Sequence, residues 1–410
     1  MYIVLATAWN FITPPFESPD EDAHVEYVLL VADQARLPDL RTDGTRVGNE
    51  FFQPPLYYVV LAAALRVSGM SHAERLPARV AAWEWETVPA NYFQLTPSRF
   101  GYVHLLREVS ALFGTVTVVC TYLAATLLGA TGRLRTSATL ATAALPQFTY
   151  ISATVNPDSL AAALASIGLV LLLKLARSPT PQRRMAAALG AVTAAGVLTE
   201  YHVGYLLVLA ALAYAFVLGR HKRALVRDGA IALAAFLACA GWWFVWNIVR
   251  YGEPSGLLRF AAEDPRSLLD PYFVFFFPRI TYNSFLGAYG WLNVYLPTAW
   301  YVAFGLLWLG ALWGMCRGTI ITRRWPAERK MLVFAPLLIL ALVLYRNLSF
   351  NAPQGRYFFA ALPAISCLFA FGLAELPGRA GRWALVAAPS FLVAANAYSL
   401  WLVWTTFARA

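Results

Sequence analysis

The sequence predicts an all-α integral membrane protein with about eleven transmembrane helices in one domain, residues 1–410. Its composition is 59% hydrophobic and only 13% charged, whereas soluble domains are roughly 45–50% apolar and about 25% charged. Long apolar runs recur along the chain and are separated by short basic loops. Lipid offers backbone amides no hydrogen-bond partner, so each run that crosses the bilayer, about 20 residues, is expected to be helical.

The first expected span is short. It covers residues 2–12, before Pro14, and lacks the charged start and small-residue cleavage site of a signal peptide. The other expected spans cover residues 105–129, 136–154, 158–176, 185–200, 201–219, 228–250, 292–316, 331–346, 356–374 and 383–407. No internal repeat is apparent, so these spans are expected to pack as one helical unit.

Charge alternates along the chain in a way that predicts orientation. The net charge is +10, and basic residues gather in every second connection, whereas the connections around Asn156, Glu200 and Asn351 carry no Lys or Arg. The positive-inside rule then places the amino terminus inside the cell, and residues 14–104 and the carboxyl terminus outside. An anionic lipid surface explains the positive excess better than nucleic acid does, so no nucleic-acid partner is expected.

Cysteine and most histidine residues give no sign of a metal site or a disulfide framework. The four cysteines are isolated in or beside apolar runs, without a Cys-x-x-Cys pair: Cys120, Cys239, Cys316 and Cys367. Four histidines are scattered without ligand spacing: His72, His104, His202 and His221. No cofactor is therefore required by the sequence, although oxygen atoms of Asp20, Glu21 and Asp158 could hold Mg²⁺ or Mn²⁺.

Two long outer segments, residues 14–104 and 251–291, are expected to carry the function, because loops of such length are usually functional. Within the first, Pro54–Val67 is an apolar helix too short to span, which we expect along the outer interface. The aromatic residues of 83–100 suit the headgroup layer. The second outer segment is expected to cover the first.

An acidic cluster follows the first span. In Pro19-Asp20-Glu21-Asp22-Ala23-His24, a helix start would place Asp20 and His24 on one face, four residues apart. A carboxylate there could accept a proton from a substrate hydroxyl. The alternative is a solvated helix start for which Asp20 serves only as the cap.

Further polar groups stand at expected outer helix ends. Gln53 and Tyr57 belong to Gln-Pro-Pro-Leu-Tyr-Tyr, and Asn156 and Asp158 flank Pro157. Helix capping alone explains Asn156 well, with Pro157 in the first turn, but it explains Asp158 less well. We expect these four side chains to contact the substrate.

Three arginines close or open expected spans on the outer side, against the positive-inside bias: Arg250, Arg346 and Arg356, the last followed by Tyr357. Arginine offers a fixed fork of donors that matches phosphate. These residues are therefore predicted to bind a phosphate, and snorkelling to outer headgroups is the alternative.

Together these motifs resemble the GT-C class of polytopic glycosyltransferases, particularly its protein mannosyltransferase-like and aminoarabinose-transferase-like branches. The likeness rests on four motifs: Asp20-Glu21-x-x-His24, Gln53 to Tyr58, Asn156-Pro157-Asp158 and Gly355-Arg356-Tyr357. More narrowly, the chain resembles an uncharacterised bacterial membrane-protein family grouped with that class, through Trp242-Trp243, Asn247, Arg250 to Pro254 and Ser284 to Trp291.

The resemblance implies transfer of a sugar from a polyprenyl-phosphate donor to a saccharide, lipid or protein acceptor, at the outer face of the bacterial inner membrane. It implies that Asp20 is the base, that Glu21 holds the acceptor or a cation, and that His24 is the motif histidine. Two departures stand out. Glu200-Tyr201 replaces a frequent Lys-Tyr, and the large soluble carboxyl-terminal domain of some members is missing.

The chemistry is also reasonable without the family. A polyprenyl phosphate leaves as a stable anion, so it needs nearby cations more than an acid, and one carboxylate suffices as base; direct displacement predicts inversion. A transporter or flippase of a lipid-linked saccharide is the alternative, but polar groups of transporters often lie near the bilayer midplane, whereas these gather at one rim. A subunit that only presents the carrier lipid is a third reading.

Overall fold

The computed structural model describes residues 1–43, 50–72, 100–177, 182–218, 222–256, 265–322 and 327–408. The described residues are overwhelmingly helical, which confirms the all-α prediction. One small exception is a hairpin of two antiparallel strands, β1 (Ala288–Tyr289) and β2 (Val294–Tyr295), in which Ala288 pairs with Tyr295.

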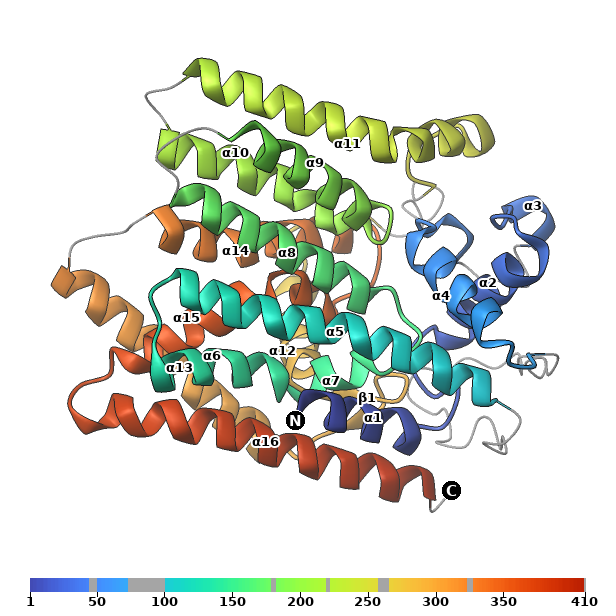
Figure 1. Ribbon diagram of the computed structural model, residues 1–410. Helices are drawn as coiled ribbons and strands as arrows, with labels where there is room; N and C mark the ends of the chain where they lie inside the picture. The colour runs from blue at the N-terminus through green and yellow to red at the C-terminus, as the bar shows by residue number, and fades with distance from the viewer. Residues whose placement is uncertain are drawn as a thin grey trace.

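The long helices lie side by side in a bundle (Figure 1). Their bounds are α1 (Tyr2–Ile12), α2 (Glu21–Gln34), α3 (Leu40–Asp43), η1 (Glu50–Phe52), α4 (Leu56–Ser68), α5 (Gly101–Leu127), α6 (Gly132–Ala143), α7 (Pro146–Ser152), α8 (Asp158–Ala176), α9 (Arg183–Val197), η3 (Tyr201–Gly204), α10 (Tyr205–Leu218), α11 (Lys222–Tyr251), η5 (Tyr272–Phe276), α12 (Phe277–Leu286), α13 (Thr298–Thr322), α14 (Ala327–Asn347), η6 (Gly355–Ala361), α15 (Leu362–Ala374) and α16 (Arg379–Ala408).

Six helices of the described chain are long and apolar enough to cross a membrane. They comprise α5, α8, α16, most of α11 and α13, and η6 continuing into α15. Shorter apolar helices are α1, α4 and the segment Tyr201–Ala215. The expected total of about eleven spans is therefore matched only in part, and the remainder stays a prediction.

Three expected spans are interrupted or shortened, each near a proline or a tight turn. Span 136–154 is divided into α6 and α7 at Pro146, whose ring removes a backbone donor. Span 356–374 begins as the 3₁₀ turn η6 and becomes α-helical at Leu362, with Pro363 in the first turn. Span 292–316 is wrong at its start, because residues 292–297 complete the hairpin and α13 begins after Pro297.

The short helices α2, α3 and α4 gather at one end of the bundle (Figure 1). Helix α4 confirms the expected helix at Pro54–Val67, and it packs on α2 through a stacked pair of rings, Tyr27 and Tyr58, with centroids 3.7 Å apart. Residues 73–99, which include most of the expected aromatic segment, lie outside the described residues. The helices α8 and η6 begin at this same end, so the loop after α1 meets them there.

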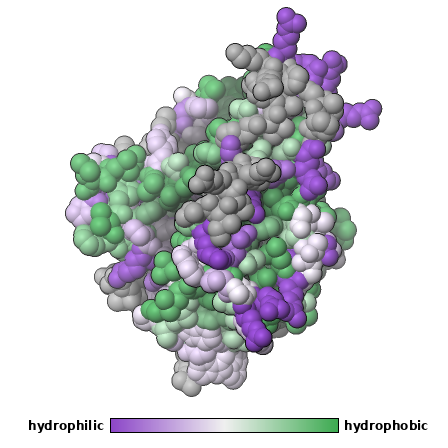
Figure 2. Space-filling view, turned by 90° about the vertical axis from the view of Figure 1, so that its left-hand side faces the viewer, coloured by the Kyte–Doolittle hydropathy of each residue, from purple (hydrophilic) through white to green (hydrophobic). Residues whose placement is uncertain are grey.

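The opposite end of the bundle carries hydrophilic residues among hydrophobic ones (Figure 2). Basic residues stand in the first turns of three helices that begin there, namely Arg133 in α6, Arg183 in α9 and Arg379 in α16. This distribution follows the charge alternation of the sequence, from which that end is predicted to face the cytosol.

Candidate functional site

Asp20 lies where the loop after α1 turns into α2. Its backbone is left-handed, with φ 61°, a conformation that aspartate tolerates better than most residues. The side chain is 38% exposed, and its Oδ2 lies 3.5 Å from Nη2 of Arg356. Asp20 is thus a partly exposed carboxylate beside the guanidinium of Arg356, although the two residues lie near opposite ends of the sequence.

The loop that carries Asp20 is fixed by a buried ion pair. Both side chains of the pair, Glu21 and Arg107, are 0% exposed, and Arg107 donates from Nε and Nη2 to the two carboxylate oxygens at 2.7 and 2.5 Å. Glu21 also accepts the backbone N–H groups of Phe16 and Val155, each at 2.9 Å. Further donor bonds of Arg107 reach loop carbonyls: Asn10, Thr13 and Pro14.

Glu21 is therefore surrounded by four donors, which leaves it no free acceptor. This geometry does not suit the expected contact between Glu21 and an acceptor or a cation. The residue instead ties the loop before α2 to α5 and to the turn before α8. A sequence pattern could not reveal this, because the partner is 86 positions away.

Arg356 occupies the centre of the cluster. Its side chain is 9% exposed, and its Nε lies 3.4 Å from Oδ2 of Asp158. Neither Nε nor Nη1 of Arg356 has a hydrogen-bond partner among the described residues. Since a buried donor without an acceptor costs about 1–3 kcal/mol, the guanidinium is suited to an anion that would supply the missing acceptors.

Close backbone packing holds Arg356 in this place. Gly355 donates its N–H to Oγ of Ser284 at 2.8 Å, and a Cβ at Gly355 would lie only 2.3 Å from the backbone nitrogen of Phe285. Only glycine fits there, so η6 is held directly against α12.

A second guanidinium lies beside the first, with one aromatic ring between them. The ring of Tyr357, which is buried, has its centroid 5.8 Å from the guanidinium carbon of Arg356 and 5.2 Å from that of Arg346. Arg346 also stacks on Phe350 at 5.3 Å and is only half-buried. Its side chain makes no hydrogen bond or ion pair within the described part of the chain. The two guanidinium groups thus lie one after the other, from the buried Arg356 to the more exposed Arg346.

Asn156 and Asp158 have different surroundings although they are two residues apart. Oδ1 of Asn156 accepts the backbone N–H of Asp158 at 2.9 Å, which is the capping contact expected from the sequence. The Asp158 carboxylate, 5% exposed, is left facing Arg356. Asn156 accordingly fixes the start of α8, and Asp158 offsets the charge of the arginine.

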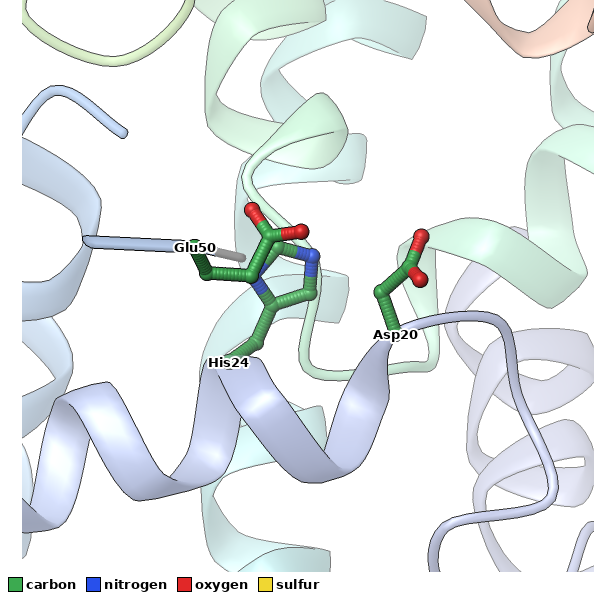
Figure 3. Close-up of side chains that lie close together, drawn as sticks. All are labelled: Asp20, His24 and Glu50. Carbon is green, nitrogen blue, oxygen red and sulfur yellow. The ribbon is translucent and has the colours of Figure 1, made fainter. Parts of the chain in front are cut away.

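His24 and Glu50 complete the cluster around Asp20, and their side chains converge in Figure 3. The ligand atoms of Asp20, His24 and Glu50 all lie within 4.8 Å of one another. Nδ1 of His24 is 2.8 Å from the hydroxyl oxygen of Tyr58, and burial lowers the pKa of His24 to about 4, so its imidazole is neutral at pH 7. Burial, aided by the charge of Asp20, raises the pKa of Glu50 to about 7.

Among the described residues, Asp20, His24 and Glu50 form the cluster that could hold a divalent cation. A neutral imidazole and two carboxylates suit Zn²⁺ or Mn²⁺, and open positions would remain for substrate. The expected oxygen-only set differs from it: Glu21 is engaged by Arg107, and Asp158 faces Arg356.

Two carboxylates of the cluster, the half-buried Glu50 and the buried Glu200, were not expected as site residues. Oε2 of Glu200 lies 3.8 Å from Nδ1 of His202, and the charges of Arg346 and Arg356 act on Glu200 as well. No local motif marks Glu50. The unusual Glu200-Tyr201 pair was the one available signal, and it appears in the sequence only as a departure from Lys-Tyr.

The other expected contact residues surround the cluster rather than forming it. The side chain of Gln53 hydrogen-bonds to Glu50, and its backbone carbonyl accepts the hydroxyl of Tyr27 at 3.2 Å. Tyr57 is fully buried, and its hydroxyl lies 2.7 Å from Oγ of Ser110. Gln53 and Tyr57 thus stabilise η1 and α4, which lie behind the carboxylates of Asp20 and Glu50.

Arg250 lies elsewhere and does not contact the cluster that Arg346 and Arg356 share. It pairs with Asp39, stacks over Trp246 with its guanidinium carbon 4.1 Å from the ring centroid, and lines a different pocket. The expectation that all three outer arginines share one phosphate site is therefore not met, because the end of α11 leans toward α3.

Comparisons with known proteins agree with this architecture. The family model described as "Predicted membrane protein (DUF2142)" matches residues 96–365. No curated protein matches the sequence significantly.

Several solved structures share the fold. ArnT from Cupriavidus metallidurans bound to undecaprenyl phosphate is 16% identical, with a TM-score of 0.59 over 99% of this chain and 75% of that one. The mycobacterial arabinofuranosyltransferase AftD is 18% identical, with a TM-score of 0.55 over 99% and 27%. The oligosaccharyltransferase AglB from Archaeoglobus fulgidus, in complex with an inhibitory peptide and a dolichol-phosphate, is 13% identical, with a TM-score of 0.51 over 99% and 55%. These neighbours are GT-C glycosyltransferases, so the fold expected from the motifs is confirmed.

Proposed function

We propose that this chain, which belongs to the DUF2142 family of predicted membrane proteins, is a glycosyltransferase that moves a sugar from a polyprenyl-phosphate donor to an acceptor on the outer face of the bacterial inner membrane. The shared fold supports the reaction class, and two of the neighbouring structures contain undecaprenyl phosphate and a dolichol-phosphate. The observation that carries the proposal is the buried guanidinium of Arg356, with unpartnered donors, beside the open carboxylate of Asp20.

Arg356 and Arg346 bind the donor phosphate in this proposal. Nη1 of Arg356, which has no hydrogen-bond partner among the described residues, would donate to a phosphate oxygen, and the half-buried Arg346 would attract the phosphate from the more exposed side. Both cations stabilise the negative charge that grows on the phosphate oxygen as its bond to the anomeric carbon breaks. No general acid is required for such a leaving group.

Asp20 acts as the base. The acceptor hydroxyl attacks the anomeric carbon from the face opposite the phosphate, its proton passes to a carboxylate oxygen of Asp20, and the electron pair of the broken bond leaves with the phosphate. One displacement inverts the configuration. A single base distinguishes this reaction from glycoside hydrolysis, which commonly uses two paired carboxylates.

Neighbouring groups position Asp20. Glu21 and Arg107 hold the loop that places it, and Asp158 keeps Arg356 oriented across from it. Asp20, His24 and Glu50 would hold a divalent cation, which would add Lewis-acid stabilisation of charged oxygen atoms. Calorimetric titration of the purified protein with Mn²⁺ tests this: binding should weaken in His24→Ala, and the absence of binding heat would rule the cation site out.

Asp20→Asn tests the assignment of the base. Purified protein in liposomes would receive undecaprenyl phosphate bearing a radiolabelled hexose or pentose, together with a mixed acceptor extract. Loss of the base should reduce transfer roughly 10²–10⁴-fold, with unchanged thermal stability. The matched control Asp33→Asn changes a half-exposed carboxylate at the other end of α2, paired with His72, and should transfer normally.

Undiminished transfer by Asp20→Asn would remove Asp20 as the base. The same assay separates the enzyme from a flippase. A flippase would move the donor across the bilayer without cleaving the bond between sugar and phosphate, whereas the proposed enzyme consumes the donor.

A further inference from the structure

The end of α11 approaches α3 at the same end of the molecule (Figure 1). A second pocket lies between these segments. Its volume is about 570 Å³, within the roughly 300–1,000 Å³ of small-molecule sites. The lining residues come from α3, η1 and the end of α11: Leu40, Arg41, Phe51, Arg250, Tyr251, Glu253 and Gly256. Arg250, Tyr251 and Glu253 belong to the Arg-Tyr-Gly-Glu-Pro motif, to which the proposed reaction assigns no task.

The pocket adjoins the Asp20 cluster through one 3₁₀ turn. Glu50 and Phe51 are consecutive in η1. The carboxylate of Glu50 lies within 4.8 Å of the ligand atoms of Asp20, while Phe51 lines the pocket and its ring centroid is 5.6 Å from that of Tyr251. A molecule in the pocket is therefore separated from the base by the width of a single turn.

The charges of the described residues at the pocket balance. Two cations, Arg41 and Arg250, stand against the carboxylate of Glu253 and that of Asp39, which pairs with Arg250. These described residues therefore give the pocket no preference for a phosphate or another acid group. This differs from the Arg356 cluster, where buried guanidinium donors lack acceptors.

The walls combine an aromatic ring with hydrogen-bonding groups. The half-buried Tyr251 offers an aromatic ring, whereas Arg41, Arg250 and Glu253 offer donors and acceptors, and Leu40 is the single aliphatic side chain among the lining residues. A sugar presents C–H groups for the ring and hydroxyls for the polar groups, so it matches both.

We infer that this pocket binds the acceptor, and that the acceptor is an uncharged saccharide. This inference rests on the proposed function and narrows the acceptor from a saccharide, lipid or protein to one class. The ring of Tyr251 contacts one sugar unit, Arg250 donates to its hydroxyls, and Glu253 accepts from them. The terminal hydroxyl then extends past η1 to Asp20, where it loses its proton on attacking the donor.

A glycan array tests the inference directly. The purified full-length protein in detergent would be applied to immobilised neutral hexose and pentose oligosaccharides, to uronate-containing and sulfated oligosaccharides, and to peptides. We expect binding to neutral glycans alone. Arg250→Ala should weaken it at least about tenfold, and Leu40→Trp, which fills the pocket without removing a charge, should abolish it.

Arg266→Ala is the matched control, because Arg266 also stacks on an aromatic ring, with its guanidinium carbon 4.5 Å from the centroid of Tyr272, away from the pocket. It should bind neutral glycans as the wild type does. Binding that favours acidic glycans or peptides, or that survives Leu40→Trp unchanged, would overturn the inference.

A parallel measurement of undecaprenyl-phosphate binding keeps the two proposals separate. Arg250→Ala should retain the affinity for undecaprenyl phosphate, and Arg356→Ala should lose it. Donor cleavage without binding of neutral glycans would overturn the acceptor pocket and leave the proposed reaction intact. Glycan binding without donor cleavage would overturn the proposed reaction, and with it the role of the pocket as an acceptor site.

Discussion

The buried pair between Glu21 and Arg107 offers the sharpest test of how the Asp20 loop is held. In Glu21→Gln, whichever oxygen becomes the amide NH₂ faces one guanidinium N–H and one backbone N–H, so two buried donors lose their acceptor. Each orphaned donor costs about 1–3 kcal/mol. Breaking a buried pair typically costs about 3–5 kcal/mol, so the two routes to the magnitude agree.

We therefore expect Glu21→Gln to lose about 3–5 kcal/mol of unfolding free energy and to lose transfer activity as well, since the Asp20 loop is released. The assay is unfolding of the purified protein by SDS in mixed micelles, followed by tryptophan fluorescence. Glu108→Gln is the control. Its carboxylate accepts from Asn10 at 2.8 Å and from Thr7 at 3.2 Å, and a glutamine can satisfy both. It should lose less than about 1 kcal/mol.

A Glu21→Gln variant as stable as the Glu108→Gln control would refute this account of the loop. So would a Glu21→Gln variant that unfolds early but transfers sugar at the wild-type rate.

Other expected outcomes follow from the same geometry. Arg356→Lys keeps the charge but loses the planar guanidinium that faces Asp20, Asp158 and the phosphate at once, so its affinity for undecaprenyl phosphate, measured by surface plasmon resonance, should fall at least about tenfold; equal affinity would show that a positive charge alone suffices. Asn156→Ala removes the cap of α8 and should cost about 1 kcal/mol of unfolding free energy, whereas Asn156→Asp should recover it. The folded-state pKa of Glu50 is raised from its ordinary value of 4.5 to about 7. Between these two pH values the folded state binds more protons than the unfolded state, so the contribution of Glu50 to stability falls as the pH rises. The stability difference between Glu50→Gln and the wild type should therefore favour the variant more at pH 8 than at pH 5. A difference that does not change with pH would show that the folded state does not raise the pKa of Glu50.

The sequence predicts much of the fold because membrane burial imposes a strong and local pattern. Helix α8 spans the expected residues 158–176, and α4 lies where a short apolar helix was expected. Runs that contain a proline near an end are less predictable, since Pro146 and Pro363 change where the α-helix begins.

The candidate site is predictable only where its residues carry a local signal. Asp20, Asp158 and Arg356 stand beside helix starts at one depth. In the structure, the guanidinium of Arg356 has a nitrogen within 3.5 Å of a carboxylate oxygen of Asp20 and another within 3.5 Å of one of Asp158. The pairing of Glu21 with Arg107 has no such signal, because the two residues meet only through the packing of α2 against α5.

The placement of Arg250 depends on which way a helix end leans, and charge alone does not decide that. Its cation was expected with those of Arg346 and Arg356, yet the end of α11 presents it to Asp39. The position of Glu50 was equally hard to predict from the sequence. It lies in a three-residue turn with no periodicity, so only the folded chain reveals that it faces Asp20.

Cryo-electron microscopy of the purified protein with undecaprenyl phosphate tests the central claim most directly. The account predicts phosphate density within hydrogen-bond reach of Nη1 of Arg356, with Arg346 on its outer side and the carboxylate of Asp20 across a gap that a sugar can fill. Phosphate density beside Arg250, or an Arg356 side chain that stays without an anion at saturating lipid, would contradict it.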